Sequence, residues 1–409
     1  MIKFSDIKVS GVDYALILVV FILIFIGLIA IYSASFQVES PALKANFSRQ
    51  ILWFFISIIF MLVAIVIPTS AYQVSAYWLY GFAIILLVLT LVLNRGSSIA
   101  RWITIGPFRF QPAEFAKIGA IIALARYLSY EQRKLTKLKD NAVAFGMVFL
   151  PFLLIVKQPD LGTAFIFLAI ILPVLFWAGL STFFLFAITA PAIVMIASFN
   201  YYTFFLAMIL IAAALLFFRR GLVISLLIMV TNIGVGIVTP ILWNHLHDYQ
   251  KHRILTFLGV EMDPHGLSYQ VIQSKVAIGS GGFLGKGLLK GTQTQLRFLP
   301  EQHTDFVFSV IGEEFGFIGS LVIIIMFLFL LLRGISIASK VRNRFSGLMV
   351  IGAVTTIGFH VIVNIGMTVG MMPVTGLPLP FLSYGGSFLI TCMILIGIII
   401  NASIRWFRY

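Results

Sequence analysis

One carboxylate in the longest polar segment of the chain, residues 244–304, has the setting of a general base. Asp263 lies in the middle of this segment and precedes Pro264 and Gly266. A carboxylate can take a proton from a hydroxyl during group transfer. Asp before Pro and Gly is also common in turns, and spacing alone favours the turn. A catalytic role for Asp263 therefore needs support from elsewhere in the sequence.

The same segment contains histidines and glycines that could contact a metal or a phosphate. His245, His247 and His252 lack the spacing of a compact zinc motif such as HExxH, so no zinc site is predicted. Residues 279–291 are rich in glycine and include Lys286, and such backbone can offer N–H groups to phosphate. The GxxxxGK[ST] spacing of a P-loop is missing, which argues against a nucleotide site.

A second polar stretch, residues 94–111, leads into an apolar run that carries charged residues of its own. Arg101 and Trp102 lie in the stretch, and Glu114 and Lys117 follow three residues apart on one helical face. Ionisable groups inside a membrane helix are functional candidates by default. A purely structural ion pair and a role in a site both remain open for Glu114 and Lys117.

Other polar groups interrupt the apolar runs near the C-terminus. We expect Glu313 and Glu314 to hydrogen-bond within a helix bundle and His360 to be a packed histidine. Residues 372–387 are rich in Pro and Gly and include Ser383. They predict a broken helix, which is tolerated at membrane depth only against protein or a cavity.

The elements that hold these groups are predicted by composition. Of the 409 residues, 61% are apolar and only 10% are charged, whereas soluble domains carry about a quarter charged residues. Apolar runs of about twenty residues recur, long enough to cross a bilayer as helices. The sequence predicts an all-α, polytopic membrane protein with a single domain, residues 1–409. Twelve helices are expected, at 12–34, 48–68, 75–94, 112–130, 142–157, 160–180, 182–199, 203–218, 221–243, 305–333, 347–370 and 381–404.

Basic residues predict the orientation in the membrane. With twelve helices their main clusters all fall on one side, which the positive-inside rule makes cytoplasmic, together with both termini. The net charge of +14 is explained by this bias and by attraction to membrane lipids, so nucleic acid is not an expected partner. The single cysteine, Cys392, excludes an intrachain disulfide. The clusters lie at residues 3–8, 133–139, 219–220, 333–344 and 405–408.

Several cations fall on the opposite, exterior side of this topology. They run against the positive-inside bias and would suit an anionic, phosphorylated lipid substrate. These cations are Arg95, Arg101, Arg109, Lys157, Lys251, Arg253, Lys275, Lys286, Lys290 and Arg297.

Seven stretches make the chain resemble the SEDS family of cell-wall synthases. They cover most of the chain in the family's order, and residues 291–296 and 373–380 are most similar to its elongation branch, with the division and sporulation branches as alternatives. The family usually has ten helices, so residues 182–220 look like an inserted helix pair. The stretches are RWI at 101–103, FQPAEFAK at 110–117, QPDLGT at 158–163, HDYQ at 247–250, YQVIQS at 269–274, the run 279–314 that includes LPEQHTDF at 299–306 and GEE at 312–314, and LPLPFLSYGGS at 377–387.

The resemblance implies a peptidoglycan glycosyltransferase that polymerises lipid II at the outer face of the bacterial inner membrane. Asp263 corresponds to the family's catalytic aspartate and becomes the expected general base, in a large extracytoplasmic loop at 244–304. It is also a candidate ligand for Mg²⁺ or Mn²⁺, and no organic cofactor is expected. A class B penicillin-binding protein and other elongation-complex proteins are the expected partners.

Positive charge near Asp263 would stabilise the departing lipid diphosphate. Arg101 and Lys117 are the leading candidates, Glu114 would orient Lys117, and Trp102 would pack on the substrate or anchor at the interface. A lipid II flippase and a scaffold for the penicillin-binding protein are the alternatives. The full predicted substrate-binding set is Arg101, Trp102, Glu114, Lys117, Lys275, Lys286, His303, Ser383 and Tyr384.

Overall fold

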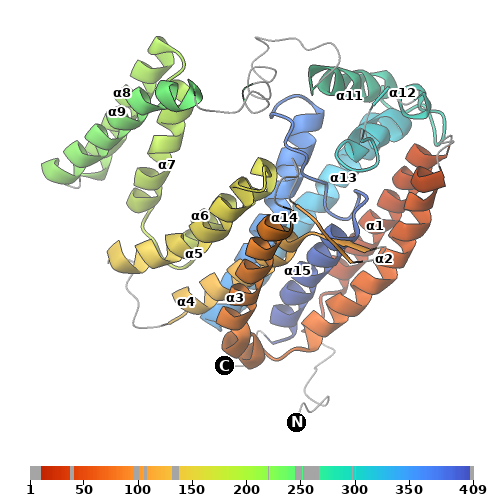
Figure 1. Ribbon diagram of the computed structural model, residues 1–409, viewed down its shortest axis with the longest axis horizontal. Helices are drawn as coiled ribbons and strands as arrows, with labels where there is room; N and C mark the ends of the chain where they lie inside the picture. The colour runs from red at the N-terminus through yellow and green to blue at the C-terminus, as the bar shows by residue number, and fades with distance from the viewer. Residues whose placement is uncertain are drawn as a thin grey trace. The chain divides into compact units, whose positions relative to one another are not determined.

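The structure, a computed structural model, contains fourteen helices and one two-stranded sheet within its described residues (Figure 1). The chain forms two compact units, residues 1–178 with 263–409 and residues 179–262, and each is described by itself. Asp263, His245, His247 and His252 lie outside the described residues. The described ranges are 11–36, 41–94, 101–105, 108–130, 138–219, 221–244, 251, 267–296, 298–299 and 301–405.

The first unit contains most of the helices and the sheet. Its elements are α1 (Tyr14–Ser35), α2 (Pro41–Val66), α3 (Thr69–Leu93), β1 (Ile103–Ile105), β2 (Phe108–Phe110), α4 (Pro112–Leu128), α5 (Leu138–Val156), α6 (Leu161–Trp177), α11 (Leu267–Gly281), α12 (Thr292–Gln295), α13 (Val307–Lys340), α14 (Arg344–Thr368) and α15 (Gly386–Ile404). The second unit packs α7 (Thr182–Ala197), α8 (Tyr201–Phe218) and α9 (Leu222–Asn244) against one another.

Each of the twelve predicted membrane helices corresponds to a helix of the structure. Eight described helices are long and apolar enough to cross a membrane, α5 to α7 are shorter apolar helices, and α4 carries three charged residues. The protein is therefore a polytopic, helical membrane protein. Helix α2 begins at Pro41 rather than 48, because polar residues before 48 interrupt the apolar run but continue the helix, and Asn46 among them is buried against protein.

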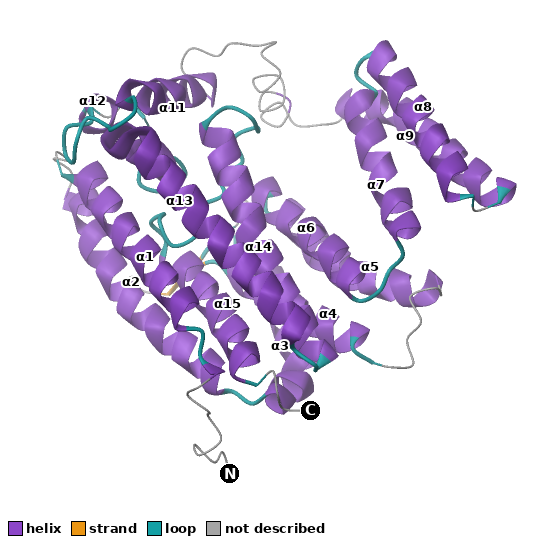
Figure 2. Ribbon diagram, turned by 180° about the vertical axis from the view of Figure 1, so that it is seen from behind, coloured by secondary structure: helices purple, strands orange, loops and turns teal. Residues whose placement is uncertain are grey.

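Helices α14 and α15 are the most buried of the eight long apolar helices, and α14 contacts α4, α6, α13 and α15 (Figure 2). Helix α15 packs along α2, and the two helices meet closely where Gly397 lies against the backbone of Met61. A side chain at Gly397 would displace α2. The small residue thus allows the close approach that stabilises helix pairs in membranes.

Polar caps fix several helix starts in this apolar chain. The Asp13 carboxylate accepts a hydrogen bond from the N–H of Leu16 at 3.1 Å and pairs with Arg333 Nε at 2.5 Å, which joins α1 to α13. Asn343 caps α14 by accepting from the N–H of Phe345 at 3.0 Å. Such caps satisfy helix N–H groups that have no partner within the helix.

Helix α13 is interrupted at Gly316, whose φ of +65° suits glycine. The carbonyls of Glu313 and Glu314 accept instead from the N–H groups of Lys286 and Gly287, each at 3.0 Å. The glycine-rich stretch was expected to offer N–H groups to a ligand. The N–H groups of Lys286 and Gly287 are instead bonded to carbonyls that the interruption of α13 leaves without a helical partner. For these two N–H groups the expectation was wrong.

The Pro- and Gly-rich stretch before α15 is irregular, as predicted, and it lies against protein. Leu377, Leu379, Phe381, Leu382 and Ser383 are all buried. Two elements were not predicted from the sequence. These are the β1–β2 hairpin and the α11–α12 segment that follows the undescribed part of the long loop.

Candidate functional site

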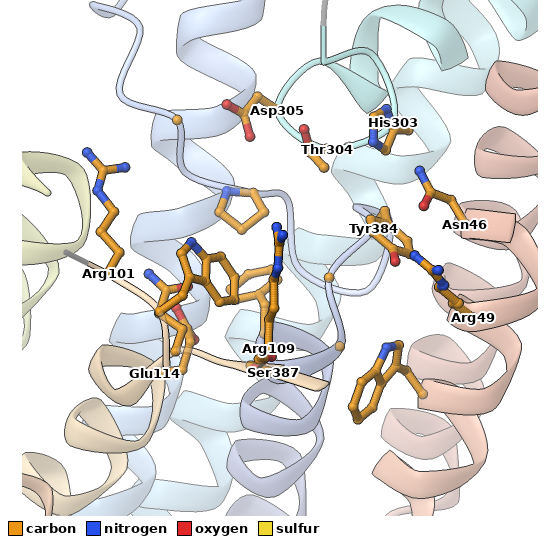
Figure 3. A pocket seen from close by; sticks show the side chains of 18 of the residues that line it. Asn46, Arg49, Arg101, Arg109, Glu114, His303, Thr304, Asp305, Tyr384 and Ser387 are labelled. Atoms are coloured by element: carbon orange, nitrogen blue, oxygen red, sulfur yellow. Dashed lines mark hydrogen bonds between the residues drawn. The ribbon is translucent and has the colours of Figure 1, made fainter. Parts of the chain in front are cut away.

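A pocket of about 1170 Å³ lies in the first unit where α2, the hairpin and the loops before α13 and α15 meet (Figure 3). This exceeds the size of most small-molecule pockets, about 300–1,000 Å³. The pocket is lined by Asn46, Arg49, Leu52, Trp53, Arg101, Trp102, Thr104, Arg109, Gln111, Glu114, Asp160, Thr163, Glu301, His303, Thr304, Asp305, Gly376, Pro378, Tyr384, Gly385, Gly386, Ser387 and Phe388.

The α2 wall presents one helical face to the pocket. Asn46, Arg49 and Trp53 lie three and four residues apart, so they project from the same side of the helix. Between them, the buried Gln50 accepts a hydrogen bond from the N–H of Gly385 at 3.2 Å and donates to the carbonyl of Ser383 at 3.3 Å. Gln50 therefore fixes α2 to the loop that precedes α15.

The hairpin carries cations on the facing wall. Thr104 and Arg109 are cross-strand partners, so both side chains lie on the sheet face that lines the pocket. Arg101 donates to the carbonyl of Pro159, and its Nε lies 3.8 Å from Asp160 Oδ2. Figure 3 shows Arg101 and Arg49 at opposite sides of the pocket with Arg109 between them.

Asp160 positions Arg101 and also caps a helix. It accepts from the N–H of Thr163 at 3.3 Å, which caps α6, and from the Thr163 hydroxyl at 3.0 Å. Gln111 Nε2 donates to the same carboxylate at 3.3 Å. Asp160 thereby joins the hairpin's exit to the start of α6, and it was not among the predicted site residues.

At the inner wall, Glu114 and Lys117 form the ion pair that their spacing allowed. Lys117 Nζ lies 2.8 Å from Glu114 Oε1 and 3.2 Å from His360 Nε2, and the Lys117 side chain is fully buried. Lys117 does not line the pocket, whereas Glu114 does. Glu114 Oε2 is buried and has no hydrogen-bond partner in the described part of the chain.

The loop that leads into α13 forms one rim of the pocket, and His303 belongs to this loop. The N–H of Tyr384 donates to the His303 carbonyl at 2.9 Å, and the two rings lie 5.8 Å apart. Burial lowers the pKa of His303 below its usual value, and the Glu301 charge opposes this shift only in part. Ser383 is buried and donates to the Thr304 carbonyl at 2.5 Å, so it holds the rim rather than facing the pocket.

The structure brings together five of the predicted substrate-binding residues, namely Arg101, Trp102, Glu114, His303 and Tyr384. Lys117, Lys275, Lys286 and Ser383 do not line this pocket. Lys275 is exposed on α11, and Lys286 pairs with Glu313 Oε1 at 2.8 Å.

Sequence reasoning missed Arg49, Asp160 and Asp305 as residues that line the pocket, and placed Arg109 only among the exterior cations. For Arg109 a signal existed, since Ile-Thr-Ile and Phe-Arg-Phe alternate as a half-buried hairpin does. A signal existed for Arg49 as well, since it lies inside the helix predicted at 48–68 and charged residues within membrane helices are functional candidates.

Metal ligands do not gather within the described residues. No group of three or more His, Cys, Asp or Glu side chains there could hold an ion. The described carboxylates of the pocket therefore do not form a preformed metal site, and Asp263 lies outside the described residues.

Comparison with known proteins identifies close relatives over the whole chain. The model of the FtsW, RodA and SpoVE family, described as cell cycle protein, matches residues 14–208 and 188–406. The peptidoglycan glycosyltransferase MrdB of Escherichia coli K12 is 37% identical over 95% of this chain and 92% of its own length. The peptidoglycan glycosyltransferase RodA of Treponema pallidum is 33% identical over 97% and 98%.

Solved structures agree with these relatives. A chain of a peptidoglycan synthase complex that coordinates polymerization and crosslinking has 29% identity and a TM-score of 0.71, over 97% of this chain and 99% of that chain. RodA of Thermus thermophilus, a rod shape determining protein, has 25% identity and a TM-score of 0.64, over 97% and 98%. From the length and identity of these matches, the protein belongs to the FtsW, RodA and SpoVE family of cell cycle proteins, the SEDS family.

Proposed function

We propose that the protein is a peptidoglycan glycosyltransferase of the elongation type, which polymerises lipid II in the cytoplasmic membrane with its pocket on the extracytoplasmic side. The observation that carries the proposal is the large pocket with Arg49, Arg101 and Arg109 on its walls, in a chain 37% identical to a named peptidoglycan glycosyltransferase. Guanidinium groups bind phosphate oxygens well, in pairs of hydrogen bonds.

The proposed reaction joins a sugar hydroxyl of one lipid-linked disaccharide to the anomeric carbon of another. The new C–O bond forms as the bond to the diphosphate breaks, and the lipid diphosphate leaves with the electron pair. Asp263 accepts the hydroxyl proton as general base. Arg101, Arg109 and Arg49 stabilise the negative charge on the leaving group. Lys117 is fully buried behind Glu114, so it pairs with the Glu114 carboxylate and does not contact the diphosphate.

A divalent cation, Mg²⁺ or Mn²⁺, belongs to the proposal as an ion recruited with the substrate. The described residues offer no cluster of metal ligands, so Asp263 and the diphosphate oxygens would hold it together. When bound, the ion would supply further positive charge to the leaving group. No step assigned here to the protein's own residues depends on it.

The partner is proposed to be a class B penicillin-binding protein, which would cross-link the strands within a larger elongation complex. Support comes from the structural neighbour, a chain of a complex that coordinates polymerization and crosslinking. A single assembly would pass new glycan directly from polymerase to transpeptidase.

Purified protein incubated with lipid II tests the function. Polymer is expected on a glycan gel from the wild type and not from Asp263→Ala, with melting temperatures alike, and chelation of divalent ions should reduce the yield. Equal yield from both proteins would remove Asp263 from the mechanism. Transport of labelled lipid II across vesicles without any polymer would favour the flippase.

A further inference from the structure

A chain of buried polar groups runs from the pocket wall into the helix core. Glu114 Oε1 accepts from Lys117 Nζ at 2.8 Å, and Lys117 Nζ lies 3.2 Å from His360 Nε2. His360 Nδ1 lies 3.1 Å from the carbonyl oxygen of Pro378. Helices α4 and α14 and the loop before α15 thus meet through four groups in series.

The partners of His360 determine where its proton lies. A carbonyl oxygen only accepts, so Nδ1 carries the hydrogen and donates to Pro378. A lysine ammonium only donates, so Nε2 has a free lone pair and accepts from Lys117. The ring is therefore the neutral Nδ1–H tautomer, fixed from both sides.

Lys117 is held in place by three different contacts. Its ammonium donates to Glu114 and to His360, and it lies 5.5 Å from the ring centroid of Phe388, within the range of a cation–π contact. With hydrogen bonds to Glu114 Oε1 and to His360 Nε2, the ammonium makes none to the second oxygen of Glu114.

That second oxygen is left without a protein partner. Glu114 is 3% exposed and lines the pocket, and its buried Oε2 accepts no hydrogen bond from the described residues. A buried acceptor without a donor is unfavourable, so an arrangement that maintains one suits a ligand that supplies the donor. A carboxylate accepts from hydroxyl and amide N–H groups, and an N-acetylated sugar carries both.

We propose that His360 is a positioning residue of the glycosyl transfer site. By accepting a hydrogen bond from Lys117, it holds Lys117 on Glu114 Oε1 and leaves Oε2 to accept from a hydroxyl or amide N–H of the sugar. This inference rests on the proposed polymerase function and adds to it a contact for the uncharged part of the substrate.

Two variants of His360 separate positioning from packing. His360→Gln retains a carbonyl acceptor for Lys117, whereas His360→Asn retains a donor for the Pro378 carbonyl and removes that acceptor. In His360→Asn we expect Lys117 to bridge both oxygens of Glu114 and kcat for lipid II polymerisation to fall about 10- to 100-fold. KM should change less, and His360→Gln should retain most of the rate.

The melting temperature of each variant in detergent is the control for folding. Equal losses of rate in the two variants, or losses that follow the melting temperature, would overturn positioning and leave a packing role.

¹⁵N-histidine NMR of the full chain tests the tautomer of His360 without measuring activity. The His360 signal is assigned by its loss in His360→Gln. A neutral ring protonated on Nδ1 is expected, and an imidazolium or an Nε2–H ring would overturn the inference. A wild type that makes no polymer would refute the polymerase function, while the ring signal would still decide the tautomer.

Discussion

Two lysine–carboxylate pairs in the first unit have the same length and different surroundings. Lys117 Nζ lies 2.8 Å from Glu114, and Lys286 Nζ lies 2.8 Å from Glu313. Both carboxylates are buried within helices, and sequence reasoning expected an ion pair only for the first. The comparison shows which features separate a carboxylate of the site from one that holds the fold together.

Both carboxylate oxygens of Glu313 accept hydrogen bonds from other residues of the protein. It accepts from Lys286, from the hydroxyl and N–H of Thr294 at 2.8 and 3.0 Å, and from the N–H of Gln293 at 2.8 Å. These bonds fix the start of α12 to α13. Glu114 has one donor, Lys117, and an unpartnered oxygen beside a pocket. Burial and pairing are common to both, so the remaining acceptor and the adjoining pocket identify the functional carboxylate.

The largest effect is expected from Glu114→Gln. The change removes the counter-charge of a fully buried ammonium, which should destabilise the protein by about 3–5 kcal/mol. It also puts an amide where the substrate would meet a carboxylate, so polymerisation should fall about 10²-fold or more. Gel analysis of lipid II products and thermal melting measure the two effects.

The double variant Glu114→Gln with Lys117→Met separates stability from activity. It removes both charges and should recover most of the melting temperature, because a buried pair can often be replaced by neutral groups at little cost. The polymerisation rate should stay low. A double variant that polymerises lipid II at the wild-type rate would show that the Glu114 carboxylate has no role in the reaction.

A smaller effect, confined to stability, is expected at the second pair. Glu313→Gln places an amide against backbone N–H donors and should cost about 1–3 kcal/mol. Lys286→Met should cost at most about 1 kcal/mol, because the Lys286 side chain is 24% exposed and Glu313 keeps its other donors. Folded protein of both variants should polymerise lipid II near the wild-type rate. Slower polymerisation by a fully stable Lys286→Met would return Lys286 to the substrate-binding set.

The fold was largely predictable because a bilayer imposes a minimum length on each apolar helix. All twelve predicted helices are present, and their boundaries differ in both directions: α15 begins at Gly386 rather than 381, because the Pro- and Gly-rich stretch before it is irregular. Helix α2 begins seven residues before its predicted start, because its first residues include polar ones such as Asn46, which is buried against protein but which an apolar-run criterion reads as loop. Helix α11 has mixed polarity and was counted as part of the long loop for the same reason.

The site was predictable only where its contacts are local in the chain. The Glu114–Lys117 pair follows from a three-residue spacing, whereas His360 joins it from 243 residues away. Likewise, nothing near Lys286 indicates Glu313 as its partner, since a loop and a helix must first fold together. Local periodicity predicts which face a residue occupies, and it contains no information about which distant helix covers that face.

The smallest effect is expected at an ionisable group of the pocket that has no lysine partner, His303. Burial lowers the pKa of His303 in the folded protein. At a pH below about 6.5, the pKa of histidine in the unfolded chain, the unfolded chain therefore binds a proton that the folded protein does not. Stability should therefore fall as pH drops through that value, and His303→Asn should lose less melting temperature than wild type between pH 7.5 and 5.5. Glu301→Gln removes the charge that favours protonation and should increase the loss at low pH. Parallel pH profiles for all three proteins would mean that His303 has the same pKa in the folded and unfolded chains. The part of the pocket rim around His303 would then be more accessible to water than either lysine–carboxylate pair.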